Sequence, residues 1–455
     1  MPRRLPLFAT AARGTEELLA EELAELGAVR VRADRGGVRF LANLHEALRI
    51  ALWSRIAMRL LWPLAEAEAH GAQGLYDAAH AVPWEEHLDP GATFAVEATL
   101  RDSEHTHSGF VALKIKDALV DRLRERRGER PDVDTRRPDV SIVAHLAGTR
   151  LSLSLDVAGA PLNQRGYRVR PTVAPLKETL AAAILHAVRY SGDEPLVDPM
   201  CGSGTLVIEA GLIAVRRAPN LHRRFGIERW PSLGPEARAI LERLRAEARA
   251  NERRAPFPIR GFDRSTEAVE AARANVRAAR LEREVTLTTA DATRPLPLGE
   301  VDHGLLVTNP PYGDRLTQGG QKGMKTFYFQ LGERLGGLAG FRMAILSGNP
   351  AFEAAFHHRP LRRRPLWNGP IECTLLEYAP RAGRTPGDAP PHHGRSGSAA
   401  PRLSDPGLAP TEKPADVSPV RPEHRREEHR DQPRRSDGSP GDEPGDRDRD
   451  EPGEQ

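Results

Sequence analysis

Short apolar runs alternate with helical patterns from about residue 172 to residue 380, and this alternation constrains the fold more than any other feature. Most of the runs precede a turn and then a helical pattern. The runs lie at residues 195–197, 259–262, 285–289, 305–308 and 343–346. Strands that alternate with helices are typical of a parallel sheet with helices on both faces. We therefore predict an α/β fold for this region.

Two stretches depart from the alternation. Residues 215–256 include an Arg/Glu-rich helical pattern, which we interpret as part of an insertion between the first crossover helix and the second strand. The last apolar runs, at 361–366 and 371–378, are joined through Asn368-Gly-Pro. Because so short a connection can join only antiparallel strands, we expect an antiparallel pair at one edge of the sheet.

Two smaller α/β patterns precede this region. The first should contain three strands and two helices, with Thr15 as an N-cap and Gly27 as a helix stop. The second should contain a strand, an amphipathic helix at 107–121 and a hairpin. The expected strands are 5–9, 29–31, 38–41, 94–100, 140–146 and 150–157. The expected domains are 1–63, 64–165 and 166–380.

Composition limits the classes of protein to which the chain can belong. Residues 381–455 are rich in proline and glycine and lack aromatic side chains, so we expect a disordered tail. The chain has 2 cysteines and no His/Cys spacing typical of a metal site, so no metal is expected. No apolar run has the length of a signal peptide or membrane span, so we expect a cytoplasmic protein. The net charge of +3 permits a polyanionic partner without requiring one.

A glycine-rich segment, Asp198-Pro-Met-Cys-Gly-Ser-Gly-Thr205, joins the first apolar run to a helical pattern. Glycines let a ligand approach the backbone, and a helix N-terminus presents free N–H groups to it. A dinucleotide site would need a third glycine where Val207 stands, so that interpretation is poor. Asp263 and Asp291 stand where the next two strands should end, which is where α/β sheets bind ligands. Each aspartate alone could equally be a helix cap or a solvated residue.

The sharpest motif is Asn309-Pro-Pro-Tyr312, directly after the run at 305–308. The prolines stiffen the turn, and an Asn oxygen with a rigid carbonyl can accept hydrogen bonds from an exocyclic amine. Such acceptors would localise the amine lone pair and aim it at an electrophilic methyl group. Tyr312 offers a face on which a base can stack. A proline-rich turn without a function is the alternative.

These two motifs together resemble those of class I S-adenosylmethionine-dependent methyltransferases that modify exocyclic amines. More closely, the chain is similar to bacterial THUMP-containing 23S rRNA guanine-N2 methyltransferases over about residues 5–380. Further matching segments are 8–14, 107–108, 116–121, 165–168, 174–183, 220–225, Trp230 and 368–373. The resemblance implies a Rossmann-like methyltransferase domain, preceded by a ferredoxin-like domain and a THUMP RNA-binding domain. Some relatives add a second methyltransferase domain where this chain has the tail, so no second modification is implied.

The resemblance also implies S-adenosylmethionine as the cofactor and assigns residues to it. Asp198, Gly202 and Gly204 would surround its methionine end, Asp263 its ribose and Asp291 its adenine. The segment around the cofactor comprises Asp198, Pro199, Met200, Cys201, Gly202, Ser203, Gly204 and Thr205. The guanine would lie against Asn309, Pro310, Pro311 and Tyr312.

The expected activity is methyl transfer to the N2 amine of a guanine in RNA, with 23S rRNA as the partner. Candidates for RNA contact, each of which could equally be solvated, are His107, Lys114, Lys116, Arg165 and Arg168. A tRNA guanine-N2 methyltransferase would share both motifs, whereas a DNA adenine-N6 enzyme would not need a THUMP domain. A non-catalytic RNA-binding ribosome assembly factor is the alternative of another class. The intact aspartates and Asn309 argue against it.

Overall fold

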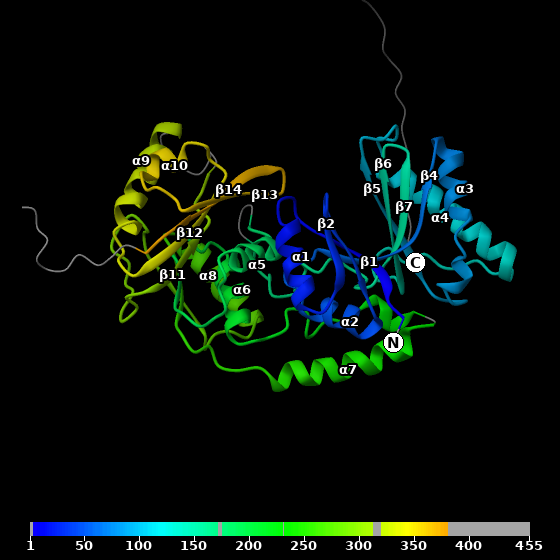
Figure 1. The fold of residues 1–455 in the computed structure, drawn as a ribbon, viewed down its shortest axis with the longest axis horizontal. Helices are drawn as coiled ribbons and strands as arrows, with labels where there is room; N and C mark the ends of the chain where they lie inside the picture. The colour runs from blue at the N-terminus through cyan, green and yellow to red at the C-terminus, as the bar shows by residue number, and fades with distance from the viewer. Residues whose placement is uncertain (1–2, 172–174, 231, 313–319, 381–455) are drawn as a thin grey trace, which may run out of the picture. The chain divides into compact units, whose positions relative to one another are not determined.

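The computed structural model describes residues 3–171, 175–230, 232–312 and 320–380, and the expected tail at 381–455 lies outside the described residues. Within the described part, the strands form two seven-stranded sheets (Figure 1). Strands from the first 156 residues make one sheet, and strands from residue 196 onward make the other.

The first sheet has the order β2-β3-β1-β4-β7-β6-β5. Its central strand, β4 (Arg59–Glu68), pairs with β1 on one side and β7 on the other, so it runs across residue 63 and joins the two N-terminal patterns. The sequence did not predict β4, because buried and exposed residues do not alternate regularly along it. Its register against β7 also shifts after Pro63. The expected strands are present as β1 (Leu5–Thr10), β2 (Val29–Asp34), β3 (Gly37–Ala42), β5 (Phe94–Arg101), β6 (Val140–Ala147) and β7 (Arg150–Asp156).

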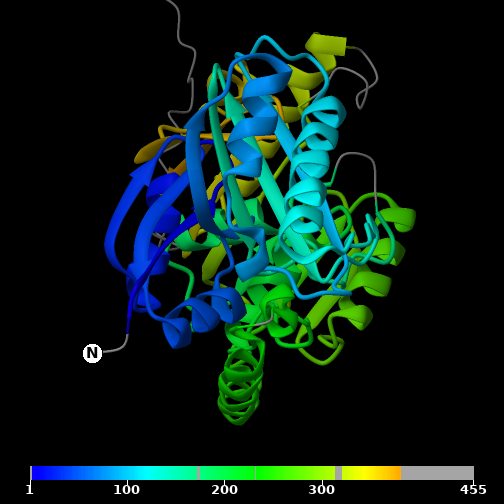
Figure 2. The same ribbon diagram turned by 90° about the vertical axis from the view of Figure 1, so that its right-hand side faces the viewer.

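The helices of this half are α1 (Glu16–Glu25), α2 (Leu44–Trp53), α3 (Gly71–His80) and α4 (Ser108–Arg127). The α3 and α4 helices contact each other beside the strands β4 to β7 (Figure 2). Asn43 caps α2, because its Oδ1 accepts a hydrogen bond from the Glu46 backbone N–H at 2.9 Å. Thr15 does stand at the N-cap of α1, but its hydroxyl donates to the Ala12 carbonyl at 2.7 Å and makes no capping bond. The sequence therefore predicted the N-cap position of Thr15 correctly, and only the side-chain capping bond is absent.

The second sheet has the order β10-β9-β8-β11-β12-β14-β13. The first five strands in this order pair in parallel, and β14 and β13 pair antiparallel at the edge, as the sequence predicted. The strands are β8 (Leu196–Asp198), β9 (Ile259–Asp263), β10 (Val285–Thr289), β11 (Gly304–Thr308), β12 (Phe341–Ser347), β13 (Arg362–Asn368) and β14 (Ile371–Tyr378). The helices are α5 (Glu178–Ala187), α6 (Thr205–Ala214), α7 (Gly234–Ala250), α8 (Thr266–Ala278), α9 (Gly320–Leu335) and α10 (Phe352–Phe356).

Both faces of this sheet are buried. Leu196 and Leu305 belong to one hydrophobic core together with residues of α6 and α8, whereas Val197 and Leu306 belong to a second core with residues of α9 and α10. Successive side chains of a strand point to opposite faces, so helices cover the sheet on both sides. This arrangement confirms the Rossmann-like α/β fold.

The insertion between α6 and β9 lies against the N-terminal half. Its long helix α7 contacts α2, and the Asn220 side-chain amide donates to the Ala51 carbonyl of α2 at 3.0 Å. The side chain of Asn220 is buried, so this contact excludes water. The sequence located the insertion, but its packing against α2 became visible only in the structure.

Candidate active site

The glycine-rich turn and the Asn-Pro-Pro-Tyr segment lie at neighbouring strand ends. β8 and β11 pair in parallel, while β9 lies on the other side of β8. The strand order therefore reverses at β8, and ligands bind outside the carboxyl ends of strands at such a point. The Thr308 hydroxyl donates to Asp198 Oδ1 at 2.8 Å and links the ends of β11 and β8 directly.

The turn after β8 requires glycine at two positions. Gly202 has φ +54° and Gly204 has φ +86°, both in the left-handed region that side chains disfavour. A Cβ atom on Gly202 would meet nothing within 4 Å, so the turn faces open space there. A Cβ atom on Gly204 would come within 3.2 Å of the Ala272 Cβ, which explains how closely α8 packs behind the turn.

The predicted aspartates lie at the ends of the successive strands β8, β9 and β10. Asp198 and Asp263 are the last residues of β8 and β9, and Asp291 lies two residues after β10. Asp263 Oδ2 accepts a hydrogen bond from the Gly202 N–H at 3.0 Å, which holds the glycine-rich turn against the end of β9. The backbone N–H of Ala290 donates to the Asp263 carbonyl at 2.9 Å, so the segment before Asp291 is tied to the same place. Asp291 lines an open cavity of about 430 Å³ together with Thr293 and residues of α9.

Cys201 is buried within this turn. Its backbone N–H donates to the Phe262 carbonyl at 2.7 Å, and burial raises the pKa of its thiol well above the ordinary value. A Cβ atom on Gly261 would come within 3.2 Å of the Cys201 sulfur. Cys201 thus fills space between the turn and β9 as a neutral thiol.

Asp198 is the most deeply buried of the three aspartates, with 1% of its surface exposed. Burial raises the pKa of Asp198 to about 7, and the Asp263 carboxylate adds to this rise. Hydrogen bonds from the Thr308 hydroxyl and from the Met200 N–H act in the opposite direction. A buried acid of this kind favours the folded state when it is protonated, and its contribution to stability is lost as the pH rises.

We expect Asp198→Asn to raise the melting temperature of the cofactor-free protein relative to the wild type. Asparagine keeps an oxygen that accepts hydrogen bonds from Thr308 and Met200 but carries no charge. The difference should grow as the pH rises from 3.8 to about 7 and then stay constant. Thermal melts of both proteins across this pH range test the expectation. A difference that does not change with pH would contradict it.

The Asn309-Pro-Pro-Tyr312 segment presents an acceptor without a partner. Asn309 Oδ1 is buried, and no hydrogen-bond donor in the described part of the chain reaches it. Such an oxygen costs free energy unless a ligand or water satisfies it. The Tyr328 hydroxyl of α9 donates to the Pro311 carbonyl at 2.7 Å and holds the turn in place.

A second asparagine, whose role the sequence did not predict, holds Tyr312. The Asn368 side-chain amide donates to the Tyr312 hydroxyl at 2.6 Å from the end of β13. A Cβ atom on Gly348 would come within 3.0 Å of the Tyr312 ring, so glycine at that position leaves room for the ring. Asn368 belongs to a segment that carries the family resemblance, and only the structure connects this segment to Tyr312.

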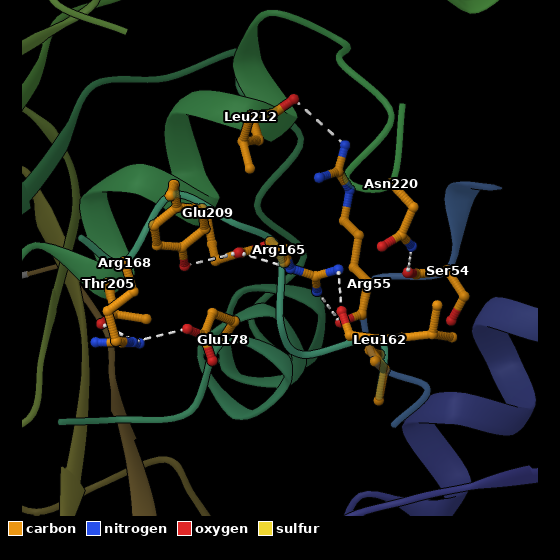
Figure 3. A network of polar contacts seen from close by, with 12 residues as sticks. Ser54, Arg55, Leu162, Arg165, Arg168, Glu178, Thr205, Glu209, Leu212 and Asn220 are labelled. Atoms are coloured by element: carbon orange, nitrogen blue, oxygen red, sulfur yellow. Dashed lines mark hydrogen bonds and ion pairs between the residues drawn. The ribbon is translucent and has the colours of Figure 1, made fainter. Parts of the chain in front are cut away.

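Two arginines predicted to contact RNA make hydrogen bonds and ion pairs within the protein, and only one of them is buried. Arg165 is 1% exposed and its Nε lies 2.9 Å from Glu209 Oε1 (Figure 3). Tyr167 donates to the same oxygen. Arg168 pairs with Glu178 and donates to the hydroxyls of the glycine-rich turn. The expectation for Arg165 is corrected, because a buried guanidinium paired with a buried carboxylate cannot contact a phosphate. Arg168 is 18% exposed, and its contact with RNA stays a prediction.

The other three RNA candidates lie on α4 or at its N-cap. His107 is the exposed N-cap residue of the helix and makes no capping bond with its side chain. Lys114 lies 6.0 Å from the Phe110 ring, and Phe110 is 41% exposed. Lys116 pairs with its neighbour Asp117 at 2.5 Å. These residues lie in the N-terminal half, whereas the candidate active site belongs to the second sheet.

Two further observations concern only the described residues. They contain no group of three or more His, Cys, Asp or Glu side chains arranged to hold a metal ion. None of their helices combines the length and the apolarity that crossing a bilayer requires.

Comparisons with known proteins agree with this fold. Residues 165–377 match the RMKL-like methyltransferase domain, residues 70–156 the THUMP domain and residues 6–61 the RlmL ferredoxin-like domain. The chain is 38% identical over 379 residues to slr0064 of Synechocystis sp., which bears the name of an RNA methyltransferase, and covers 96% of it. The chain therefore belongs to the RMKL-like methyltransferases that carry a THUMP domain.

Longer relatives and a solved structure are also similar. The chain is 43% identical over 387 residues, or 83% of its length, to the ribosomal RNA large subunit methyltransferase K/L of Syntrophotalea carbinolica. It spans about half of that relative, covering 54% of its length. The crystal structure of SMU.472 complexed with SAH superposes with a TM-score of 0.75 at 31% identity, over 85% of this chain and 100% of SMU.472.

Proposed function

We propose that this protein transfers a methyl group from S-adenosylmethionine to the exocyclic N2 amine of a guanine in 23S rRNA. The observation that carries the proposal is the buried Asn309 Oδ1, which has no hydrogen-bond donor among the described residues. Asn309 directly follows Thr308, whose hydroxyl donates to Asp198 at the end of β8. An exocyclic amine N–H can supply the donor that this oxygen lacks. The rRNA is favoured over other RNAs by the relationship to the K/L methyltransferase.

The glycine-rich turn fits the proposed cofactor. The space in front of Gly202 admits a ligand, and Asp263 stands beside it with a partly exposed carboxylate that can accept from ribose hydroxyls. Asp291 lies two residues after β10, and its carboxylate would accept a hydrogen bond from the adenine amino group. The surrounding residues of the proposed cofactor site are Asp198, Pro199, Met200, Cys201, Gly202, Ser203, Gly204 and Thr205.

The chemistry assigned to the protein is positioning. S-adenosylmethionine, when bound, supplies the electrophilic methyl group. The Asn309 side-chain oxygen and the Pro310 carbonyl accept the two amine hydrogens, so that the nitrogen lone pair points at the methyl group. Pro311 stiffens the turn, and Tyr312, held by Asn368, stacks on the guanine. The amine becomes acidic once it is methylated, so the site needs no strong base.

The proposal is tested by methyl transfer to RNA from cells that lack the gene. Radiolabelled cofactor should label 23S rRNA and not tRNA, and mass spectrometry of rRNA fragments should show one N2-methylguanine that the mutant cells lack. Labelling confined to tRNA would identify a tRNA methyltransferase instead. No labelling of either RNA would favour a non-catalytic assembly factor.

We also propose a division of labour along the chain, with domains at 1–63, 64–165 and 166–380 and with the protein acting in the cytoplasm. The first two would bind RNA and the third would carry the chemistry. The exposed Phe110 beside Lys114 supports this proposal, because an aromatic ring and a cation can contact a base and a phosphate. His107 and Lys116 lie on the same helix.

Lys114→Gln in the full chain should weaken rRNA binding and leave cofactor affinity unchanged. Loss of one phosphate contact should reduce the slope of log affinity against log salt by about one. Filter binding across a salt series measures both quantities. Arg243→Gln, on the exposed face of α7, is the control for a lost charge. Equal effects of the two substitutions would mean that Lys114 makes no specific contact.

A further inference from the structure

Arg168 is attached to the glycine-rich turn through both of its terminal nitrogens. Its Nη1 donates to Ser203 Oγ at 3.1 Å. Its Nη2 donates to Thr205 Oγ1, also at 3.1 Å (Figure 3). Ser203 and Thr205 are each 4% exposed and flank Gly204, the residue with φ +86°. A single guanidinium therefore holds the residues on both sides of Gly204 in the turn.

Arg168 is itself held on its other side. Its Nε lies 2.8 Å from Glu178 Oε1, at the start of α5, and its Nη2 also donates to the Leu176 carbonyl at 2.9 Å. The planar fork of arginine allows these bonds to form at once, which lysine cannot do with one nitrogen. Arg168 therefore connects the glycine-rich turn to α5, a helix that precedes the second sheet in the sequence.

The residues after Arg168 are attached to the same turn through Asn275 of α8. Asn275 Oδ1 accepts from the backbone N–H groups of Val169 and Arg170, each at 2.9 Å, and its Nδ2 donates to the Ser203 carbonyl at 3.0 Å. Asn275 is fully buried. The segment 165–170 and the glycine-rich turn are therefore joined by two independent sets of hydrogen bonds, one through Arg168 and one through Asn275.

Arg165 attaches the segment 165–170 to the N-terminal half. Arg165 pairs with Glu209 of α6 and donates to the Arg55 carbonyl (Figure 3). Arg55 Nη2 in turn donates to the Arg217 carbonyl at 2.8 Å. Glu209 lies one helical turn after Thr205. The segment 165–170 is thus bound to α6 at Glu209 and to the glycine-rich turn just before α6.

We propose that Arg168 is a positioning residue for the cofactor-binding turn, which it holds in the binding conformation before the cofactor arrives. This inference rests on the proposed cofactor site. Pre-organisation of a binding loop improves affinity because less ordering is left to occur on binding. Arg168 does not touch the reacting atoms in this assignment. Its loss should therefore weaken cofactor binding more than the methyl-transfer step.

The test compares Arg168→Ala with Arg217→Ala in the full chain. Arg217 is a matched control, because its side chain is 17% exposed against 18% for Arg168, pairs with Glu252 at 3.0 Å and donates to the Ala279 carbonyl. No contact joins its side chain to Ser203 or Thr205 among those the structure describes. Calorimetry should give Arg168→Ala a dissociation constant for S-adenosylmethionine about tenfold above the wild type. Arg217→Ala should lower the melting temperature and leave this constant unchanged.

Two further measurements separate positioning from general stability. Hydrogen exchange of residues 199–205 in the cofactor-free protein should be faster in Arg168→Ala than in Arg217→Ala. At saturating cofactor, kcat of Arg168→Ala should stay within about threefold of the wild type while KM for the cofactor rises. Arg168→Lys keeps the charge but not the fork, so its KM should remain raised, and added guanidinium ion should partly restore affinity to Arg168→Ala.

Several outcomes would overturn the inference. If Arg168→Ala loses stability but binds S-adenosylmethionine as the wild type does, Arg168 is a structural ion-pair partner only. If Arg217→Ala raises the dissociation constant equally, the effect comes from destabilisation. A wild-type protein that does not bind S-adenosylmethionine would instead refute the proposed cofactor site, and calorimetry shows this before any variant is made.

Discussion

Replacing Asn309 with alanine should lower kcat by about 10²–10³-fold and change the affinity for S-adenosylmethionine by no more than a few fold. The buried Asn309 oxygen has no donor among the described residues, and in the proposed mechanism it acts on the guanine amine. The contacts assigned to the cofactor follow β8, β9 and β10 instead. Single-turnover kinetics with rRNA, beside calorimetry with the cofactor, measures the two effects separately.

Asn349→Ala is the matched control for this substitution. Asn349 also follows a strand of the sheet, β12, but its Oδ1 already accepts a hydrogen bond from the Ala351 N–H at 2.9 Å. Its replacement should leave kcat within about threefold of the wild type. An Asn309 variant that no longer binds the cofactor would show that Asn309 belongs to the cofactor site rather than to the guanine site.

Replacing Asp263 with alanine should have the opposite effect to Asn309→Ala, because it should weaken cofactor binding strongly and lower kcat much less. Two charge-assisted hydrogen bonds to ribose hydroxyls would be lost, and the dissociation constant for S-adenosylmethionine should rise by on the order of 10²-fold. The Gly202 N–H would also lose its acceptor at 3.0 Å, which loosens the turn. At saturating cofactor, kcat should fall far less than in Asn309→Ala.

Two other substitutions sharpen the interpretation of Asp263. Asp263→Asn keeps an acceptor for the Gly202 N–H but loses the charge, so an intermediate dissociation constant is expected. Asp302→Ala removes an acid whose side chain is 87% exposed, and it should leave cofactor binding unchanged. Normal cofactor affinity in Asp263→Ala would mean that the ribose is held elsewhere.

The order of strands and helices in the second sheet could be predicted from the sequence. Apolar runs such as 305–308 mark strands because both faces of this sheet are buried, and glycines such as Gly202 and Gly204 mark the turn because only glycine tolerates its backbone angles. Both signals are local. The sequence likewise located Asn309 and Tyr312, because the motif that contains them is continuous.

Contacts between distant segments could not be predicted in this way. Arg165 and Arg168 stand in a basic stretch that is typical of a phosphate-binding surface, and nothing in their neighbourhood in the chain indicates that Glu209 and Glu178 neutralise them. Asn368 meets Tyr312 only because β13 and β14 return along β12. A charged or polar side chain has the same local pattern whether water or a buried partner satisfies it.

The sequence by itself determined the fold class, the two motifs and the family, because periodicity, turn chemistry and a continuous motif are properties of neighbouring residues. Only the tertiary structure decided that β4 joins the two N-terminal patterns in one sheet, that Asn309 presents an unsatisfied oxygen and that Arg168 holds the glycine-rich turn. The physical reason is that pairing, burial and hydrogen-bond satisfaction depend on which distant groups meet. These meetings are fixed by the packing of whole elements rather than by any local segment.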